Sequence, residues 1–235
     1  MEDFGIVNED NGESNPALDK IRKLLAKAES TDSEAERDAL NARANELIAK
    51  YGIDEAMAAQ GRPSGDDMAA KEYEIHGDYA DEIARLLVRL GVALGCEGIL
   101  TYSGATIIGY LADIERLEVL YTSLSLQMHS GAVRVEGSIS VRRGWMIGFA
   151  ETVALRVREA EARAKQDAGG DGSPTALVLA SRGLAVRKAF NEEFPHTTRS
   201  KSRVNMGAYA DGAAAGRRAD IGGKRVGDSR RALAG

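Results

Sequence analysis

The sequence predicts an α+β fold dominated by helices, in which long helices cover a small sheet of three or four strands. Most of the chain shows apolar residues at helical spacing between capping signals, and only a few short runs are rich in β-branched residues. Aromatic residues make up 5% of the 235 residues and glycines number 26, which favours helices packed through small side chains. A hydrophobic content of 43% is enough for a core in one or two domains.

A helical hairpin is predicted over residues 15–60. Asn15 can cap the first helix, and Pro16 suits the first helical position, where a missing N–H costs nothing. The apolar face of this helix comprises Leu18, Ile21, Leu25 and Ala28, with Leu24 beside them. Another face carries Lys20, Lys23 and Lys27.

The second helix of the hairpin opens with Ser33 and Glu36, which have the spacing of a capping box. Gly52 is expected to end it in the left-handed conformation, followed by a short helix over 53–60. A connection of about four residues makes the two helices antiparallel neighbours. The apolar stripe of the second helix comprises Leu40, Ala44, Leu47, Ile48 and Tyr51.

Beyond the hairpin, an α+β domain is predicted over 71–198. Ser103 and Gly104 separate two short β-rich runs, which is typical of a β-hairpin. Strands are expected at 71–76, 98–102, 105–110 and, as a fourth candidate, 175–180. Helices are expected at 79–94, 113–127, 143–165 and 183–193, with a last helix near 206–218.

The remaining segments are distinguished by composition. Residues 1–14 are polar and acidic without periodicity, and we expect them to be disordered. Residues 61–70 are expected to form a linker, and residues 199–235 a basic C-terminal segment. The chain shows no apolar run of the roughly 20 residues needed to cross a membrane and no signal peptide, so we expect a cytoplasmic protein.

Three blocks of the hairpin, at 20–30, 34–36 and 44–54, resemble the domain of unknown function 2786 in order and spacing. The middle of the chain is also similar to the domain that usually follows this module, as is the ending at 208–218. The residues that carry this second similarity are Gly109, Asp113, Tyr121, Leu124, Trp145, Gly148, Phe149, Val153 and Arg156. The resemblance implies a cytoplasmic bacterial, prophage or bacteriophage protein, and it brings no catalytic residues.

Charge is distributed unevenly along the chain. Residues 181–235 contain twelve Lys and Arg against five Asp and Glu, a net charge of +7. The other 180 residues therefore carry −12, because the whole chain carries −5. A basic end on an acidic body is the surface best suited to a polyanion.

The predicted nucleic-acid-binding residues belong to this basic end, where guanidinium and ammonium groups can pair with phosphates. They are Arg199, Lys201, Arg203, Arg217, Arg218, Lys224, Arg225, Arg230 and Arg231. A solubilising role, or contact with the acidic body, is the alternative. The lysines of the first helix could also follow a phosphate backbone, or they could simply form a solvated face.

Patterns typical of catalysis or metal binding are absent from the sequence. The single Cys96 excludes an intramolecular disulfide framework and reads as a small packing residue. The histidines, at 76, 129 and 196, are far apart, and there is no nucleophile elbow or phosphate-binding loop. We therefore expect no catalytic residues, no metal and no cofactor.

These observations favour a non-enzymatic binding protein that engages nucleic acid or a ribonucleoprotein through its basic end, with the helical hairpin docking another protein. One alternative is a hydrolase or nuclease-like enzyme whose carboxylates gather only in the fold. That hypothesis requires Asp78, Asp81, Asp113 and a histidine to converge. Another alternative is a structural or inhibitory protein that acts on a host protein.

Overall fold

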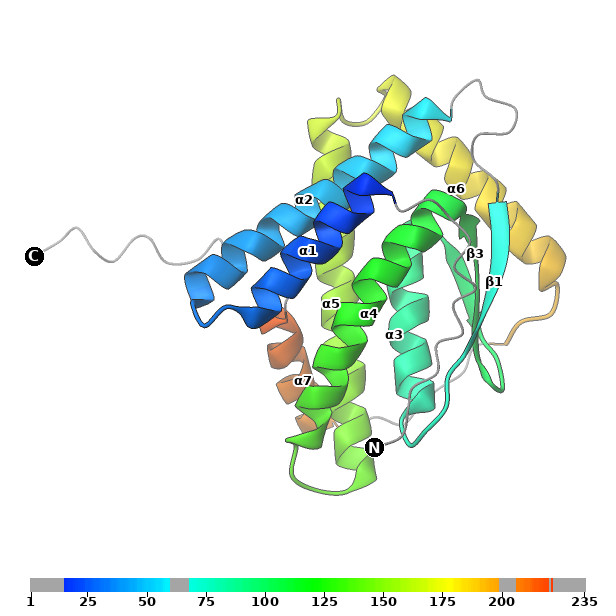
Figure 1. Ribbon diagram of the computed structural model, residues 1–235. Coiled ribbons are helices and arrows are strands. Elements are labelled where there is room, and N and C mark those ends of the chain that lie inside the picture. The colour runs from blue at the N-terminus through cyan, green and yellow to red at the C-terminus, as the bar shows by residue number, and fades with distance from the viewer. Residues whose placement is uncertain (1–14, 60–67, 199–205, 220, 222–235) are drawn as a thin grey trace, which may run out of the picture.

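The computed structural model describes residues 15–59, 68–198, 206–219 and 221, and confirms the predicted helix-rich α+β class (Figure 1). The described residues form seven helices and a three-stranded antiparallel sheet. None of these helices has the length and apolarity needed to span a membrane. The helices are α1 (Pro16–Ser30), α2 (Glu34–Ala58), α3 (Ala80–Ala93), α4 (Leu111–Val133), α5 (Ile139–Asp167), α6 (Pro174–Glu193) and α7 (Met206–Arg218). The strands are β1 (Met68–Glu74), β2 (Glu97–Leu100) and β3 (Gly104–Tyr110).

The start of the helical hairpin follows the sequence signals. The Asn15 side chain accepts a hydrogen bond from the Ala17 N–H at 3.0 Å, as an N-cap does. Its amide also donates to the hydroxyl of Tyr51 on α2 at 2.8 Å, so the cap ties the two helices together. The predicted apolar face of α1 is buried, and its lysines are exposed.

The turn between α1 and α2 forms only half of the predicted capping box. Ser33 Oγ accepts the Glu36 N–H at 3.3 Å. The Glu36 carboxylate does not return to Ser33; it accepts a hydrogen bond from Thr31 and pairs with Lys27 at 3.0 Å. Arg37 closes the turn by donating to the carbonyls of Ala28 and Thr31 at the end of α1.

The expected end of α2 at Gly52 is wrong. α2 continues without a break to Ala58 and includes the region expected as a separate short helix. Gly52 does not adopt the left-handed conformation. A glycine occurs there because a Cβ would overlap the guanidinium of Arg116 on α4, so a tertiary contact explains the residue.

The sheet has the order β1-β3-β2, with β3 in the middle. The strands β1 and β3 pair so that Lys71 lies opposite Ile107, and the turn at 101–103 connects β2 to β3. The Ile107 side chain points toward α3, where it lies near Gly91. α6 contacts β2 and β3 on the other face, and Arg187 of α6 pairs with Glu97 there. β1 begins at Met68, within the segment expected as a linker.

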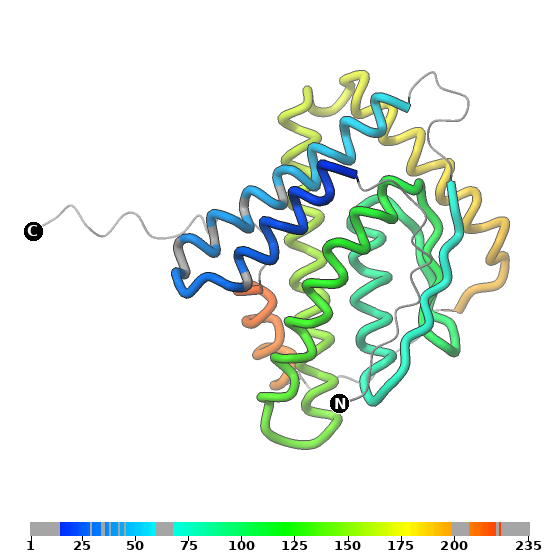
Figure 2. Tube along the Cα trace, in the orientation of Figure 1, coloured from blue at the N-terminus to red at the C-terminus, as the bar shows by residue number. Residues whose placement is uncertain are grey.

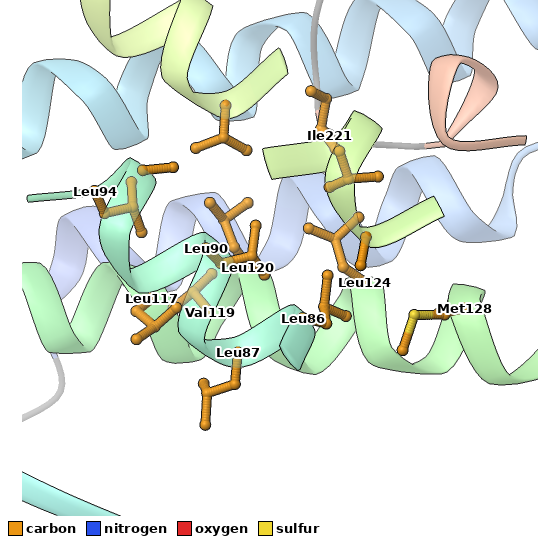
Figure 3. Packing of buried hydrophobic residues seen from close by; sticks show 14 of the residues in the cluster. Leu86, Leu87, Leu90, Leu94, Leu117, Val119, Leu120, Leu124, Met128 and Ile221 are labelled. Carbon is orange, nitrogen blue, oxygen red and sulfur yellow. The ribbon is translucent and has the colours of Figure 1, made fainter. Parts of the chain in front are cut away.

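The core lies between α3, α4 and α5 and extends into the helical hairpin (Figure 3). α3, which the apolar spacing over 79–94 predicted, contributes the buried residues Leu86, Leu87 and Leu90. Leu117, Leu120, Leu124 and Met128 of α4 lie beside them, and α4 runs six residues beyond its predicted end. Because residues of α1 and α2 belong to the same cluster, the hairpin packs against the rest of the described chain.

The expected fourth strand at 175–180 is wrong, since these residues form the first turns of α6. Ser173 caps this helix by accepting the Ala176 N–H at 3.1 Å, and Pro174 occupies the first turn. Residues 175–180 include a short apolar run, which fits a strand or a buried helix equally well by periodicity. The cap at Ser173 and the proline at position 174 favour the helix over the strand.

α7 packs against α5 through unusually close backbone contacts. A Cβ at Gly212 would overlap the backbone of Trp145, and one at Gly148 would overlap the carbonyl of Tyr209. Trp145 and Phe149 stack with ring centroids 5.5 Å apart. Trp145, Gly148 and Phe149 of α5 therefore serve helix packing.

Candidate functional site

The most extensively bonded buried side chain described is that of Arg116 on α4, which is 3% exposed. Its guanidinium donates to Asp113 at 2.7 Å and to Glu161 of α5 at 3.0 Å. It also donates to two backbone carbonyls, that of Ile48 in α2 at 3.1 Å and that of Leu94 after α3 at 3.2 Å. One side chain thus joins four helices.

A second arginine completes this buried charge cluster, which comprises Asp113, Arg116, Glu161 and Arg182. Arg182 of α6 lies 3.3 Å from Asp113, and its guanidinium stacks on the Tyr110 ring, 3.6 Å from the centroid. Two arginines and two carboxylates make the cluster neutral overall, which is the arrangement that a buried site tolerates.

Burial and pairing shift the titration of these groups in opposite ways. Burial raises the pKa of Asp113, while Arg116 opposes that shift. Burial also disfavours the charge on Arg116, but Glu161 and Asp113 more than offset it, so the pKa of Arg116 is raised. Burial lowers the pKa of Arg182 to about 10, which leaves it charged at neutral pH.

Cys96 adjoins this cluster and is 3% exposed, as expected for a packing residue. Burial, with a contribution from Asp113, raises the pKa of its thiol to about 12. A protonated, enclosed thiol is a poor nucleophile. Its sulfur fills the space beside Gly109, where a Cβ would lie 2.5 Å from Sγ.

The carboxylates named by the hydrolase hypothesis do not converge. Asp113 lies with Leu94 at the end of α3, whereas Asp78 and Asp81 lie at its beginning, about 20 Å away along the 14-residue helix. His129 is 16 residues further along α4 than Asp113, roughly 24 Å. Within the described part of the chain, no three His, Cys, Asp or Glu side chains gather as metal ligands would.

A shallow pocket of about 300 Å³ lies at the end of the sheet near the turn between β2 and β3. Its lining carries two carboxylates and several hydroxyl groups but no cationic side chain, so it offers no positive charge to a phosphate group. The lining residues are Glu72, Tyr73, Glu74, Thr101, Tyr102, Ser103, Ala105 and Thr106.

Two of the predicted nucleic-acid-binding residues lie in the described structure. Arg217 and Arg218 are exposed in the last turn of α7. Arg156 of α5 donates to the carbonyls of Gly216 and Ala219, which fixes the end of α7 from which these arginines extend. The other seven, Arg199, Lys201, Arg203, Lys224, Arg225, Arg230 and Arg231, lie outside the described residues.

Three further cations of the basic end make contacts within the fold. Arg182 belongs to the buried charge cluster, Arg187 pairs with Glu97 at 3.3 Å, and Lys188 lies 3.8 Å from Glu192. These residues contribute to the +7 charge in sequence but have acidic neighbours in space. Among the described cations of the basic end, these three therefore differ from Arg217 and Arg218, which extend from the last turn of α7.

Sequence reasoning identified Asp113 but missed Arg116, Glu161 and Arg182. One sequence signal could have identified Arg116. It lies three residues after Asp113 on the same predicted helix, and it directly precedes the buried Leu117. A charged side chain on an otherwise apolar face indicates a buried partner. Neither Glu161 nor Arg182 has any comparable local signal, because both lie more than 40 residues away.

A family model described as "Protein of unknown function (DUF2786)" matches residues 17–55. The matched range covers α1 and most of α2, so the helical hairpin is similar to this family. It includes Ile48 and Gly52, the residues that contact Arg116. Neither the curated proteins nor the solved structures contain a match to the chain.

Proposed function

We propose that this chain is a non-enzymatic binding protein that engages nucleic acid or a ribonucleoprotein through its basic C-terminal segment, residues 199–235. The observation that carries the proposal is the +7 charge of residues 181–235 beside a body of −12. Each phosphate that a Lys or Arg neutralises releases counterions, which gives affinity without sequence choice. The proposal includes a cytoplasmic location and an origin in a bacterium, prophage or bacteriophage.

The packing of α7 supports this role for the segment. Arg217 and Arg218 extend from a helix whose backbone is pressed against α5 and whose end is held by Arg156. Such an anchor keeps Arg217 and Arg218 in place relative to the body. Cations on a fixed element lose less side-chain and backbone entropy on binding than cations on a mobile one.

In this proposal, the helical hairpin is the part of the chain that docks another protein. Its inner face packs against α4, α5 and α6, so only its outer face remains for a partner. That face carries Lys20, Lys23 and Lys27 of α1, all exposed. Lys27 pairs with Glu36, and the docking partner would accordingly present carboxylates to Lys20 and Lys23.

Binding of the full chain to duplex and single-stranded DNA and RNA, measured by fluorescence anisotropy at two salt concentrations, tests the proposal. With six phosphate contacts, we expect affinity for duplex DNA to fall about a thousandfold between about 50 and 200 mM salt. Absence of binding at the lower salt concentration would contradict the proposal. Cleavage of the nucleic acid would instead favour the nuclease-like alternative.

A matched pair of variants locates the binding surface. R217Q/R218Q removes two charges from the basic end, and K20Q/K23Q removes two charges from α1. We expect the first variant to bind more weakly and to show a salt slope smaller by about two, while the second binds like the wild type. Equal losses in both would contradict the assigned surface.

Deletion of residues 199–235 is a poor test, because it would also remove α7. Ala208 and Ala213 of that helix are buried, as are Ala219 and Ile221 just after it. A charge-neutralised variant of Lys224, Arg225, Arg230 and Arg231 keeps α7 intact. We expect it to lose affinity further when combined with R217Q/R218Q.

A further inference from the structure

The strand β1 has an outer edge with which no described strand pairs. In the sheet order β1-β3-β2, β1 pairs with β3 on one side only. All seven of its residues keep register with β3, from Met68 opposite Tyr110 to Glu74 opposite Gly104. β1 contains no proline and no bulge, two features that commonly block such an edge. The outer edge of β1 is therefore regular enough to pair with a further strand.

The hydrogen bonds of the sheet determine which backbone groups face outward. Ile75, directly after β1, donates its N–H to the carbonyl of Ser103 at 2.8 Å. In an antiparallel pair such inward-facing residues alternate along the strand, so the odd-numbered residues of β1 bond to β3. The N–H and C=O groups of Ala70, Glu72 and Glu74 therefore face the outer edge. All three residues are exposed.

The charged side chains of β1 lie on opposite faces of the sheet. Tyr73 donates to Glu118 of α4 at 2.8 Å, and Lys71 pairs with the same carboxylate. The one cation of β1 is thus engaged on the side of α4. Because successive side chains of a strand alternate, Glu72 and Glu74 lie on the other face, where α6 contacts β2 and β3.

The shallow pocket at the end of the sheet adjoins this edge. Its lining includes Glu72 and Glu74, Thr106 of β3 and the fully exposed Tyr102 of the turn, and none of its lining residues is cationic. His76 lies 3.7 Å from the Glu74 carboxylate, as an exposed pair of little net energy. A cationic side chain in this pocket would meet two carboxylates and a tyrosine ring, and both attract it.

We propose that the outer edge of β1 binds an extended peptide that carries Lys or Arg at alternate positions and adds to the sheet as a fourth strand. Backbone hydrogen bonds to Ala70, Glu72 and Glu74 provide affinity for an extended chain, and side chains at alternate positions provide selectivity. Residues of the added strand opposite Glu72 and Glu74 have Cα atoms about 5.5 Å from theirs, with side chains on the same face. Cations two residues apart therefore meet both carboxylates.

The charges of β1 argue against a second copy of this chain as the occupant. Outward-facing residues must pair with one another, so a two-fold axis between two antiparallel β1 edges passes through one residue. An axis at Glu72 sets two carboxylates opposite each other, and an axis at Lys71 sets two ammonium groups opposite each other. An axis at Tyr73 sets Glu72 against Glu74. Like charges directly opposite are destabilising, so all three central registers are disfavoured.

Fluorescence anisotropy of a rhodamine-labelled heptapeptide that alternates threonine and lysine tests the inference on the full chain. We expect saturable binding at about 50 mM salt, where screening of the carboxylates is weak. Absence of binding under this condition would overturn the inference. The result does not depend on what the basic C-terminal segment binds, because the peptide carries no phosphate.

Two N-methylated forms of the peptide separate strand addition from general attraction to an acidic body. The lysines of the added strand bond to β1, so methyl groups on their amides should weaken binding at least about tenfold. Methyl groups on the threonine amides lie at the edge facing away from β1, and binding should stay within about twofold of that of the unmodified peptide. Equal affinities of the two forms would contradict strand addition.

Two double variants of matched charge test the role of the carboxylates. E72Q/E74Q should weaken binding of the unmodified peptide about tenfold, because it removes both cross-strand ion pairs. E192Q/E193Q removes the same charge from exposed residues at the end of α6 and should bind like the wild type. Equal losses in the two variants would mean that net charge, and not this edge, attracts the peptide.

A70P tests the edge from the side of the protein. The N–H of Ala70 faces outward, so a proline there removes no bond to β3 and is tolerated as on other edge strands. We expect an unchanged thermal unfolding midpoint and a loss of peptide binding of at least about tenfold. Unchanged binding would overturn the inference. If A70P does not fold, the two N-methylated peptides still decide the question. A wild-type dimer in sedimentation that A70P abolishes would identify a second copy as the occupant and would also overturn it.

Discussion

The helical hairpin and α7 are attached to the same helical body by contacts of different character. The hairpin reaches the body in part through charge, since Arg116 bonds to the backbone of α2 and to carboxylates of α4 and α5. α7 is attached chiefly by close approach of two backbones, with glycines at the contact, and Arg156 adds hydrogen bonds to the carbonyls of Gly216 and Ala219 at its end. Figure 2 shows how far apart in sequence these two attached elements are.

The difference has an energetic consequence. A buried ionic attachment carries a desolvation cost, and removal of one partner leaves the others without compensation. Direct packing of one helix backbone on another carries no such desolvation cost. It leaves no space between the two helices, however, so even one added methyl group is destabilising. The hairpin attachment should therefore be sensitive to loss of a group, and the α7 attachment to gain of one.

The largest effect is expected for R116M. Methionine fills part of the volume but leaves the buried Asp113 and the half-buried Glu161 without Arg116, with Arg182 as the remaining cation. We expect the free energy of unfolding to fall by about 4 kcal/mol, as for the breaking of other buried ion pairs. Urea denaturation measures this loss. A loss below about 1 kcal/mol would mean that the cluster does not hold the hairpin.

G212A should have the next largest effect. The added methyl group overlaps the Trp145 backbone, which cannot rotate away, so α7 must shift from α5. We expect a loss of about 3 kcal/mol. The matched control is G183A at an exposed helical position with no atom within 4 Å of the new Cβ. That control should gain up to about 1 kcal/mol from helix propensity.

G52A tests whether charge and volume are coupled in the hairpin attachment. The methyl group overlaps the Arg116 guanidinium, which outweighs the helical advantage of alanine, and we expect a net loss of about 2 kcal/mol. In the R116M background, which replaces that guanidinium, the same change should cost far less. Additive losses in the double-mutant cycle would contradict the contact.

Y209F should have the smallest effect. The Tyr209 hydroxyl donates to Glu151, which also pairs with Arg89, and this bond adds a polar contact to the α5–α7 packing. Its loss should cost about 1 kcal/mol at neutral pH. If this loss approached that of G212A, polar contact rather than close packing would hold α7.

The same bond has a pH dependence of known sign. The hydrogen bond to Glu151 raises the pKa of Tyr209 above the ordinary value of 10.0. The folded state therefore retains the proton longer than the unfolded state, so the contribution is complete below pH 10.0 and is lost as the pH rises through the folded-state pKa. The difference between wild type and Y209F should shrink over that alkaline range.

Local signals predicted most of the fold. The cap at Asn15 and Pro16, the apolar spacing of α1 and α3 and the turn at Ser103 and Gly104 all act within a few residues. Each works through a hydrogen bond or a side-chain contact inside one element or one turn. The errors at Gly52 and at 175–180 arose where one local signal had two interpretations.

The sequence by itself therefore determined the helix-rich class, the helical hairpin, the order of the strands along the chain and the basic end. Only the tertiary structure decided the role of Gly52, the buried charge cluster and the pairing of Arg182 and Arg187. The physical reason is distance along the chain. Arg116 bonds to a carbonyl 68 residues away, and no local pattern specifies which helices will meet once the apolar faces have packed.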